Sequence, residues 1–144
     1  MATLERAIEI AARAHRGQQD KNGAPYILHP LRIMTRMPNL ETMIIAVLHD
    51  VVEDSDITLD DLRMEGFSDA IVAGVDCLTR RSREDYADYI ERVKQNPLAV
   101  QVKLGDLEDN MNLQRLDRLK EADFKRVMKY HHTFQLLKNL VSGQ

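Results

Sequence analysis

His49 and Asp50 are the residues whose types and surroundings first indicate chemistry. They follow an unbroken apolar stretch from Met43 to Leu48, and two valines come directly after them. A carboxylate is costly to bury in such surroundings unless a cation or a set of hydrogen bonds compensates its charge. The pattern therefore predicts a positively charged partner beside this pair.

Two more carboxylates share much of the same helix face. Glu53 and Asp54 stand three and four residues after Asp50, which is the spacing of side chains that lie above one another on a helix. Their mutual repulsion requires compensation, and a divalent cation supplies it. Imidazole and carboxylate together suit Mn, Fe, Zn or Ni and can leave coordination positions open for water or substrate.

One helix does not provide enough ligands for such an ion, so others must come from elsewhere. His29 is followed by Pro30 just after a loop, and Asp106 ends the largely apolar segment 102–106. A charged residue amid apolar neighbours is rarely buried without a partner. Together these residues make a candidate set of two histidines and two aspartates.

The elements expected to position these residues are helices. Apolar residues recur at helical spacing from Leu4 to Ala12, and Gly17 is a plausible end of that first helix. Residues 18–25 predict a loop, and a short helix follows with His29 at its entrance. A third, almost wholly apolar helix runs from the cap Asn39 to Val52, which places it at the centre. Further helix starts are marked by Thr58, Ser68, Ser82, Pro97 and Asp123.

These signals predict an all-α, compact bundle of about seven to eight helices in a single domain, residues 1–144. The β-branched stretch 98–104 could also form a strand, and its polar Gln101 and Lys103 leave both interpretations open. The chain is 44% hydrophobic and 30% charged, which is typical of a folded domain with its own core.

Charge and hydropathy exclude several classes of function. The formal net charge of −3 offers no basic stripe for general nucleic-acid binding. The apolar stretches are too short to span a bilayer and no signal peptide precedes them, so we expect a cytoplasmic protein without a membrane partner. The single cysteine, Cys77, excludes an intramolecular disulfide and is expected in the core.

Three motifs resemble the hydrolase domain of the Rel/Spo alarmone enzymes and the small alarmone hydrolases of the HD superfamily. They are Pro-Tyr-Ile-Leu-His-Pro-Leu-Arg at 25–32, Val-Leu-His-Asp-Val-Val-Glu-Asp at 47–54, and Val-Lys-Leu-Gly-Asp at 102–106 with Asn110. The resemblance extends from Ala7 to Leu116, and the three motifs in this order are specific where the His-Asp dipeptide alone is not.

The resemblance implies an enzyme and a set of roles. His29, His49, Asp50 and Asp106 would hold one Mn²⁺ ion, Glu53 and Asp54 would orient and deprotonate the attacking water, and Asn110 would contact the substrate near its sugar. The implied reaction is hydrolysis of the 3′-pyrophosphate of guanosine tetra- or pentaphosphate, with release of pyrophosphate. A metal-activated water and a neighbouring carboxylate base suit that chemistry.

The chain departs from the family where the substrate would be recognised. Asp20 occupies the position of an arginine that stacks on the base, although Lys21 follows it and is a candidate substrate contact. Leu107 and Asn112 replace arginines that the family often carries after Asp106. A different purine nucleotide, such as an adenosine analogue, is therefore an alternative substrate.

Other interpretations stay open beside this one. The HD scaffold also hosts nucleotidases and phosphodiesterases, and a noncatalytic nucleotide-binding or antitoxin-like module is a further alternative, which the intact Glu53 and Asp54 disfavour. The basic run at 80–83 could face phosphates, but a solvated turn is the favoured interpretation. A homodimer is possible through the apolar residues of the C-terminal helix, Leu136, Leu137, Leu140 and Val141. Three histidines fit none of the motifs: His15, His131 and His132.

Overall fold

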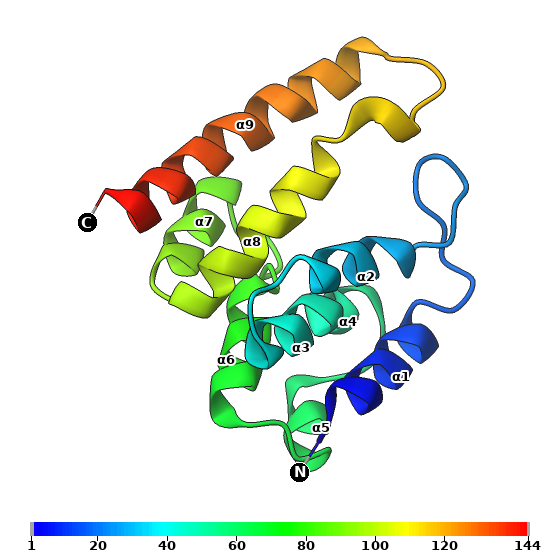
Figure 1. Ribbon diagram of the computed structural model, residues 1–144, viewed down its shortest axis with the longest axis vertical. Coiled ribbons are helices and arrows are strands. Elements are labelled where there is room, and N and C mark those ends of the chain that lie inside the picture. The colour runs from blue at the N-terminus through cyan, green and yellow to red at the C-terminus, as the bar shows by residue number, and fades with distance from the viewer. Residues whose placement is uncertain (1, 144) are drawn as a thin grey trace.

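The computed structural model describes residues 2–143, which form nine α-helices and one short 3₁₀ helix (Figure 1). Apart from an isolated bridge between Gln19 and Pro25, these residues form no strand. The prediction of an all-α fold is confirmed, and the ambiguous stretch 98–104 is helical. The elements are α1 (Leu4–Ala14), α2 (Leu28–Thr35), α3 (Leu40–Leu48), α4 (Val51–Asp54), α5 (Leu59–Met64), α6 (Asp69–Leu78), α7 (Tyr86–Lys94), α8 (Pro97–Asn110), η1 (Leu113–Arg115) and α9 (Glu121–Ser142).

Side-chain caps begin most of these helices where the sequence predicts them. Asn39 accepts a hydrogen bond from the Thr42 backbone N–H at 2.9 Å, and Thr58 forms a capping box with Asp61. Such caps satisfy backbone donors that have no partner within the helix. Helix α7 differs from the prediction, because its N-cap is Asp85 and not Ser82.

Helix α3 is the centre of the bundle, as its apolar sequence predicts. It packs against α1, α2, α6 and α8, and Figure 1 shows it enclosed between them. Ile45, Val47 and Leu48 are fully buried. Burial of this helix on several sides leaves room for polar groups only where other elements supply partners for them.

The helix that was predicted to continue to Val52 is interrupted at His49 and Asp50. The His49 ring Nδ1 lies 2.6 Å from the Ala46 carbonyl oxygen, and the His49 backbone N–H donates to the same oxygen. Asp50 adopts φ −105° and ψ 0°, and α4 then begins at Val51. The His49 side chain thus replaces part of the regular helical hydrogen bonding. Because the break divides the predicted helix into α3 and α4, the described residues form nine α-helices where about seven to eight were expected.

The C-terminal helix α9 lies along α8 and α7 and covers one side of them (Figure 1). Leu137 is buried in the core, whereas Leu136 and Val141 are exposed. His131 and His132 are exposed, as expected for solvated residues. Between residues 2 and 143, no helix combines the length and the apolar character that crossing a membrane requires.

We predict that Leu48→Ala lowers the free energy of unfolding by about 2–5 kcal/mol, because it leaves a cavity at a fully buried position. Leu40→Ala is the matched control, since Leu40 is 59% exposed, and it should change stability by no more than about 0.5 kcal/mol. Urea denaturation followed by circular dichroism measures both. Equal losses for the two variants would contradict the central placement of α3.

Candidate metal centre and its two clefts

The four candidate ligands from three separate motifs converge at one place. His29 comes from α2, His49 and Asp50 from the break after α3, and Asp106 from α8. His29 Nε2 lies 2.9 Å from Asp106 Oδ1, and His49 Nε2 lies 3.1 Å from Asp50 Oδ2 and 3.6 Å from Asp106 Oδ1. Ligand atoms of His29, His49 and Asp50 all lie within 4.8 Å of one another, as a metal site requires.

Both imidazoles are oriented by a hydrogen bond on the nitrogen that faces away from this cluster. His29 Nδ1 lies 2.7 Å from Asp109 Oδ2, and His49 Nδ1 lies 2.6 Å from the Ala46 carbonyl oxygen. These acceptors favour keeping a proton on Nδ1, so each imidazole can offer Nε2 to a cation once the Nε2 proton is lost. His49 Nε2 is buried and has no hydrogen-bond partner among the described residues. The donor set therefore fits a divalent metal ion.

The carboxylates of the cluster are held by residues of their own. Asp106 accepts from Lys103 Nζ at 2.9 Å and from Asn110 Nδ2 at 3.0 Å. Burial opposes ionisation of Asp106, but Lys103 and the two imidazoles outweigh it and hold its pKa well below the usual value. Asp50 accepts from the Tyr26 hydroxyl. Burial and Asp50 raise the pKa of Tyr26, so its phenol stays protonated and can donate.

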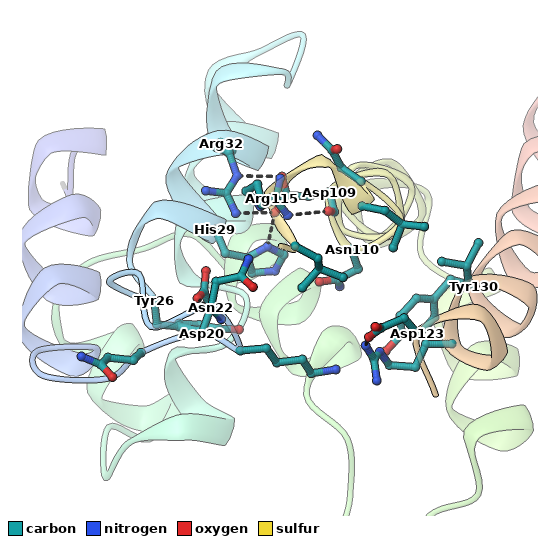
Figure 2. A pocket seen from close by; sticks show the side chains of 17 residues that line it. Asp20, Asn22, Tyr26, His29, Arg32, Asp109, Asn110, Arg115, Asp123 and Tyr130 are labelled. Atoms are coloured by element: carbon teal, nitrogen blue, oxygen red, sulfur yellow. Dashed lines mark hydrogen bonds and ion pairs between the residues drawn. The ribbon is translucent and has the colours of Figure 1, made fainter. Parts of the chain in front are cut away.

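Asp109 is a functional residue that the sequence analysis missed. Its side chain is fully buried, and besides His29 it contacts Arg32, whose Nε and Nη2 lie 2.7 and 2.9 Å from the two carboxylate oxygens. Arg115 donates to the Asp109 backbone carbonyl at 2.8 Å. Figure 2 shows the His29 and Arg32 contacts meeting at the Asp109 carboxylate. One sequence signal could have indicated Asp109. Arg32 stands three residues after His29 and Asp109 stands three residues after Asp106, which places each on the same helix face as a predicted ligand.

Glu53 and Asp54 take different places beside the cluster. Glu53 lines the cleft at the candidate ligands and accepts from the Arg80 backbone N–H at 2.9 Å. The Asp54 backbone carbonyl accepts from the Gln18 side chain, which also contacts His15 Nδ1 at 2.8 Å. Partial burial and the charges of Asp50 and Glu53 raise the pKa of Asp54 to about 6. Such a shift suits a carboxylate that accepts protons near neutral pH.

The first of two adjoining clefts, here the His/Asp cleft, contains the cluster itself. It has a volume of about 200 Å³, and its walls carry cations as well as the carboxylates. Lys103 is buried at the cluster, whereas Arg80 and Lys129 are exposed. The basic run at 80–83 is therefore solvated as expected, yet its first residue also faces this cleft.

The second, the loop cleft, opens between loop 18–25, the end of α8 and the start of α9. Its volume is about 280 Å³, and Figure 2 shows the side chains that line it. Both Lys21 and Asn110 line it, so the structure brings these two candidate substrate contacts to one cavity. The two clefts share Tyr26, His29, Asn110 and Tyr130. A ligand in the loop cleft can therefore reach the cluster.

Asp20, which departs from the family, has a structural role in this loop. Its Oδ1 accepts from the backbone N–H groups of Asn22 and Ala24 at 2.8 and 3.0 Å. Gly23 adopts φ 81°, a conformation that favours glycine. These bonds shape the turn that presents Lys21 to the cleft.

Leu107 and Asn112, which stand where the family often carries arginines, also have structural roles. Leu107 is fully buried, and Asn112 caps η1 by accepting from the Gln114 backbone N–H at 3.1 Å. The cations of the loop cleft come from other elements and are Lys21, Arg32, Arg115 and Arg126.

Comparison with known proteins agrees with this arrangement. A family model described as an HD domain matches residues 7–126. A guanosine-3′,5′-bis(diphosphate) 3′-pyrophosphohydrolase from Vibrio cholerae is 38% identical over 122 residues, which are 75% of this chain and 17% of that protein. The bifunctional (p)ppGpp synthase/hydrolase SpoT of Escherichia coli is 32% identical over 122 residues, with the same coverage. The chain thus spans about a sixth of the length of these relatives.

A solved structure shares the fold over nearly the whole chain. It is described as a metazoan ortholog of SpoT that hydrolyzes ppGpp, and it matches with a TM-score of 0.73 and 21% identity over 99% of this chain and 96% of that one. The resemblance inferred from the three motifs is confirmed. This protein, whose four candidate ligands meet between α2, α3 and α8, belongs to the HD domain family.

Proposed function

We propose that this protein is a metal-dependent hydrolase that removes the 3′-pyrophosphate from (p)ppGpp-like purine nucleotides. The observation that carries the proposal is the convergence of His29, His49, Asp50 and Asp106, where the buried His49 Nε2 faces two carboxylates and has no hydrogen-bond partner among the described residues. Relatives that contain a matching segment are named for hydrolysis of guanosine 3′,5′-bis(diphosphate), and this supports the choice of substrate.

These four residues would hold one divalent ion, and we propose Mn²⁺. Two imidazole nitrogens and two carboxylates suit that ion and leave positions open. Bound there, it would supply a Lewis acid that activates water and polarises the phosphoryl group. The hydrogen bonds of Asp109, Ala46, Lys103 and Tyr26 hold the four ligand side chains in place before any ion binds.

Glu53 and Asp54 are the proposed bases. Glu53 is oriented by the Arg80 backbone and lines the His/Asp cleft, where it can align a water molecule. As the water oxygen bonds to phosphorus, its proton passes to the carboxylate pair, and the bond between phosphorus and the 3′ oxygen breaks. The carboxylate pair then returns a proton to the 3′ oxygen, so that the sugar hydroxyl and free pyrophosphate are the products and atoms and charge balance.

The nucleoside part of the substrate fits the loop cleft. Leu113, Leu116 and Val127 provide an apolar wall for a base, with Tyr130 beside them, and Lys21 provides charge. Asn110 lines both clefts and bonds to Asp106, so its position suits contact with the sugar between the base and the reacting phosphorus.

The first test is release of pyrophosphate from guanosine and adenosine 3′-pyrophosphates with added Mn²⁺. We expect turnover with the native protein and a loss of at least about 100-fold in kcat for Glu53→Gln and for Asp50→Ala. Calorimetric titration with Mn²⁺ separates their causes, because Glu53→Gln should keep the ion and Asp50→Ala should lose it.

His131→Ala is the control, since His131 is exposed on α9, and it should retain both metal binding and turnover. Absence of turnover in native protein shown to contain Mn²⁺ would contradict the proposed reaction. Activity on only one of the two bases would identify the purine.

A second prediction concerns Asp109. Asp109→Ala should weaken Mn²⁺ binding by about 10- to 100-fold, because His29 loses the acceptor that orients it. Asp109→Asn keeps an oxygen that can accept from Nδ1, so its loss should be smaller. Asp123→Asn alters another carboxylate of the loop cleft, one paired with Arg126, and should leave the dissociation constant unchanged. Calorimetry provides the comparison, and equal affinity in all four proteins would exclude this role.

A third prediction concerns pH. Asp54 must be deprotonated to act as a base, so kcat/KM should rise with pH, with its midpoint at or below about 6, because a bound cation favours the carboxylate. Protonation at lower pH removes the base and activity falls. The residual activity of Asp54→Asn should lack this acid limb. An unchanged pH profile in that variant would assign the limb to another group.

A further inference from the structure

Beyond the candidate ligands, the His/Asp cleft has a second group of polar residues. Arg80 lies in the turn after α6, Tyr86 begins α7, Lys103 lies on α8 and Lys129 on α9. Four separate elements thus bring three cations and one phenol to a single wall, which we call the cationic wall. Lys103 is already bonded to Asp106. Arg80 and Lys129 are exposed, and although Arg80 Nη2 donates to the Glu84 carbonyl oxygen at 3.0 Å, neither side chain is paired with a carboxylate among the described residues.

The Tyr86 hydroxyl has no structural use within the described chain. Its oxygen is buried and has no hydrogen-bond partner. The neighbouring Tyr89 differs, because its hydroxyl donates to the Leu78 carbonyl at 3.0 Å. A buried hydroxyl without a partner destabilises a fold, so the presence of one beside the cluster points to a ligand that accepts its proton.

Cations lie against the same phenol ring. Lys129 Nζ is 3.9 Å from the centre of the Tyr86 ring, and the Arg80 guanidinium carbon is 5.7 Å from it. Such contacts hold the positive groups at the ring. The wall therefore combines positive charge with a free hydroxyl donor, which is the chemistry that recognises an oxyanion with several oxygens.

The two clefts differ in the part of a nucleotide that they can accept. Apolar side chains for a base lie in the loop cleft, whereas the lining of the His/Asp cleft is dominated by charged, histidine and tyrosine side chains. A polyanion in the His/Asp cleft would meet the cationic wall and also the candidate metal ligands. A nucleoside there would bury polar groups against charges that it cannot pair.

We infer that the cationic wall binds the pyrophosphate group that leaves, with the Tyr86 hydroxyl donating to a phosphate oxygen and Lys129 and Arg80 balancing its charge. This inference rests on the proposed function and assigns the leaving group to the His/Asp cleft and the nucleoside to the loop cleft. It also makes the wall a determinant of specificity, because a single phosphate cannot reach as many of these donors as pyrophosphate can.

Tyr86→Phe and Tyr89→Phe form a matched pair for the test, since each removes one oxygen. Binding of inorganic pyrophosphate to the Mn²⁺-loaded protein is measured by calorimetry, and thermal unfolding is measured without ligand. Tyr86→Phe should weaken pyrophosphate binding by about tenfold or more and leave the unfolding midpoint equal or higher. Tyr89→Phe should lower the midpoint and leave pyrophosphate affinity unchanged.

Lys129→Gln provides a second variant that does not touch the core, with Lys125→Gln as its control on the same helix. Lys125 is 75% exposed and pairs with Glu121. Of these two variants, only Lys129→Gln should show a lower affinity for pyrophosphate. Its affinity for orthophosphate should fall by a smaller factor than its affinity for pyrophosphate. The inference would be overturned if both Tyr86→Phe and Lys129→Gln bound pyrophosphate with native affinity. It would also be overturned if the controls Tyr89→Phe and Lys125→Gln lost as much pyrophosphate affinity as these two variants.

The outcomes also separate this inference from the proposed reaction. If the native protein hydrolyses the nucleotide and both Tyr86→Phe and Lys129→Gln bind pyrophosphate normally, the reaction stands and the subsite is wrong. If Tyr86→Phe loses pyrophosphate affinity but no nucleotide is hydrolysed, the wall is a pyrophosphate site in an enzyme with another substrate.

Discussion

Two imidazoles and two carboxylates meet inside an apolar helix bundle, and the rest of the structure depends on how their charges are satisfied. Burial opposes the ionisation of Asp50 and Asp106, yet the neighbouring imidazoles, and Lys103 at Asp106, keep the pKa of both carboxyls low. The groups are tolerable in the core only because they face one another. The helix break after Leu48 serves this arrangement, since His49 and Asp50 lie at the break and face Asp106 of α8 and His29 of α2.

Each candidate ligand of the cluster forms a hydrogen bond with a supporting group, and the four supporting groups are of different kinds. A buried aspartate orients His29, a backbone carbonyl orients His49, a phenol bonds to Asp50 and an ammonium bonds to Asp106. Arg32 and Arg115 in turn contact Asp109 from the loop cleft. Because these partners come from α3, from α8 and from the loop before α2, the geometry of the site depends on the packing of the whole bundle.

In the proposed function, the two clefts divide the recognition of a substrate between them. The loop cleft is shaped by internal hydrogen bonds of loop 18–25 and carries apolar side chains, while the His/Asp cleft carries the cluster and the cationic wall. His29 and Asn110 line both. Asp20 bonds within its own loop, so it can stand where the resemblance implies an arginine without disturbing the cluster.

The sequence by itself determined the class of fold and the membership of the cluster. Helical periodicity and caps such as Asn39 are local signals, and a histidine and aspartate inside an apolar stretch require partners wherever they fold. Only the tertiary structure determined which other residues surround and orient the cluster. Asp109, Tyr26 and Tyr86 carry no distinctive signal in the sequence. Their roles arise because the fold places Asp109 beside His29, Tyr26 beside Asp50, and Tyr86 beside the cations of the cationic wall. Such contacts have no periodic signature, since side-chain packing between elements creates them.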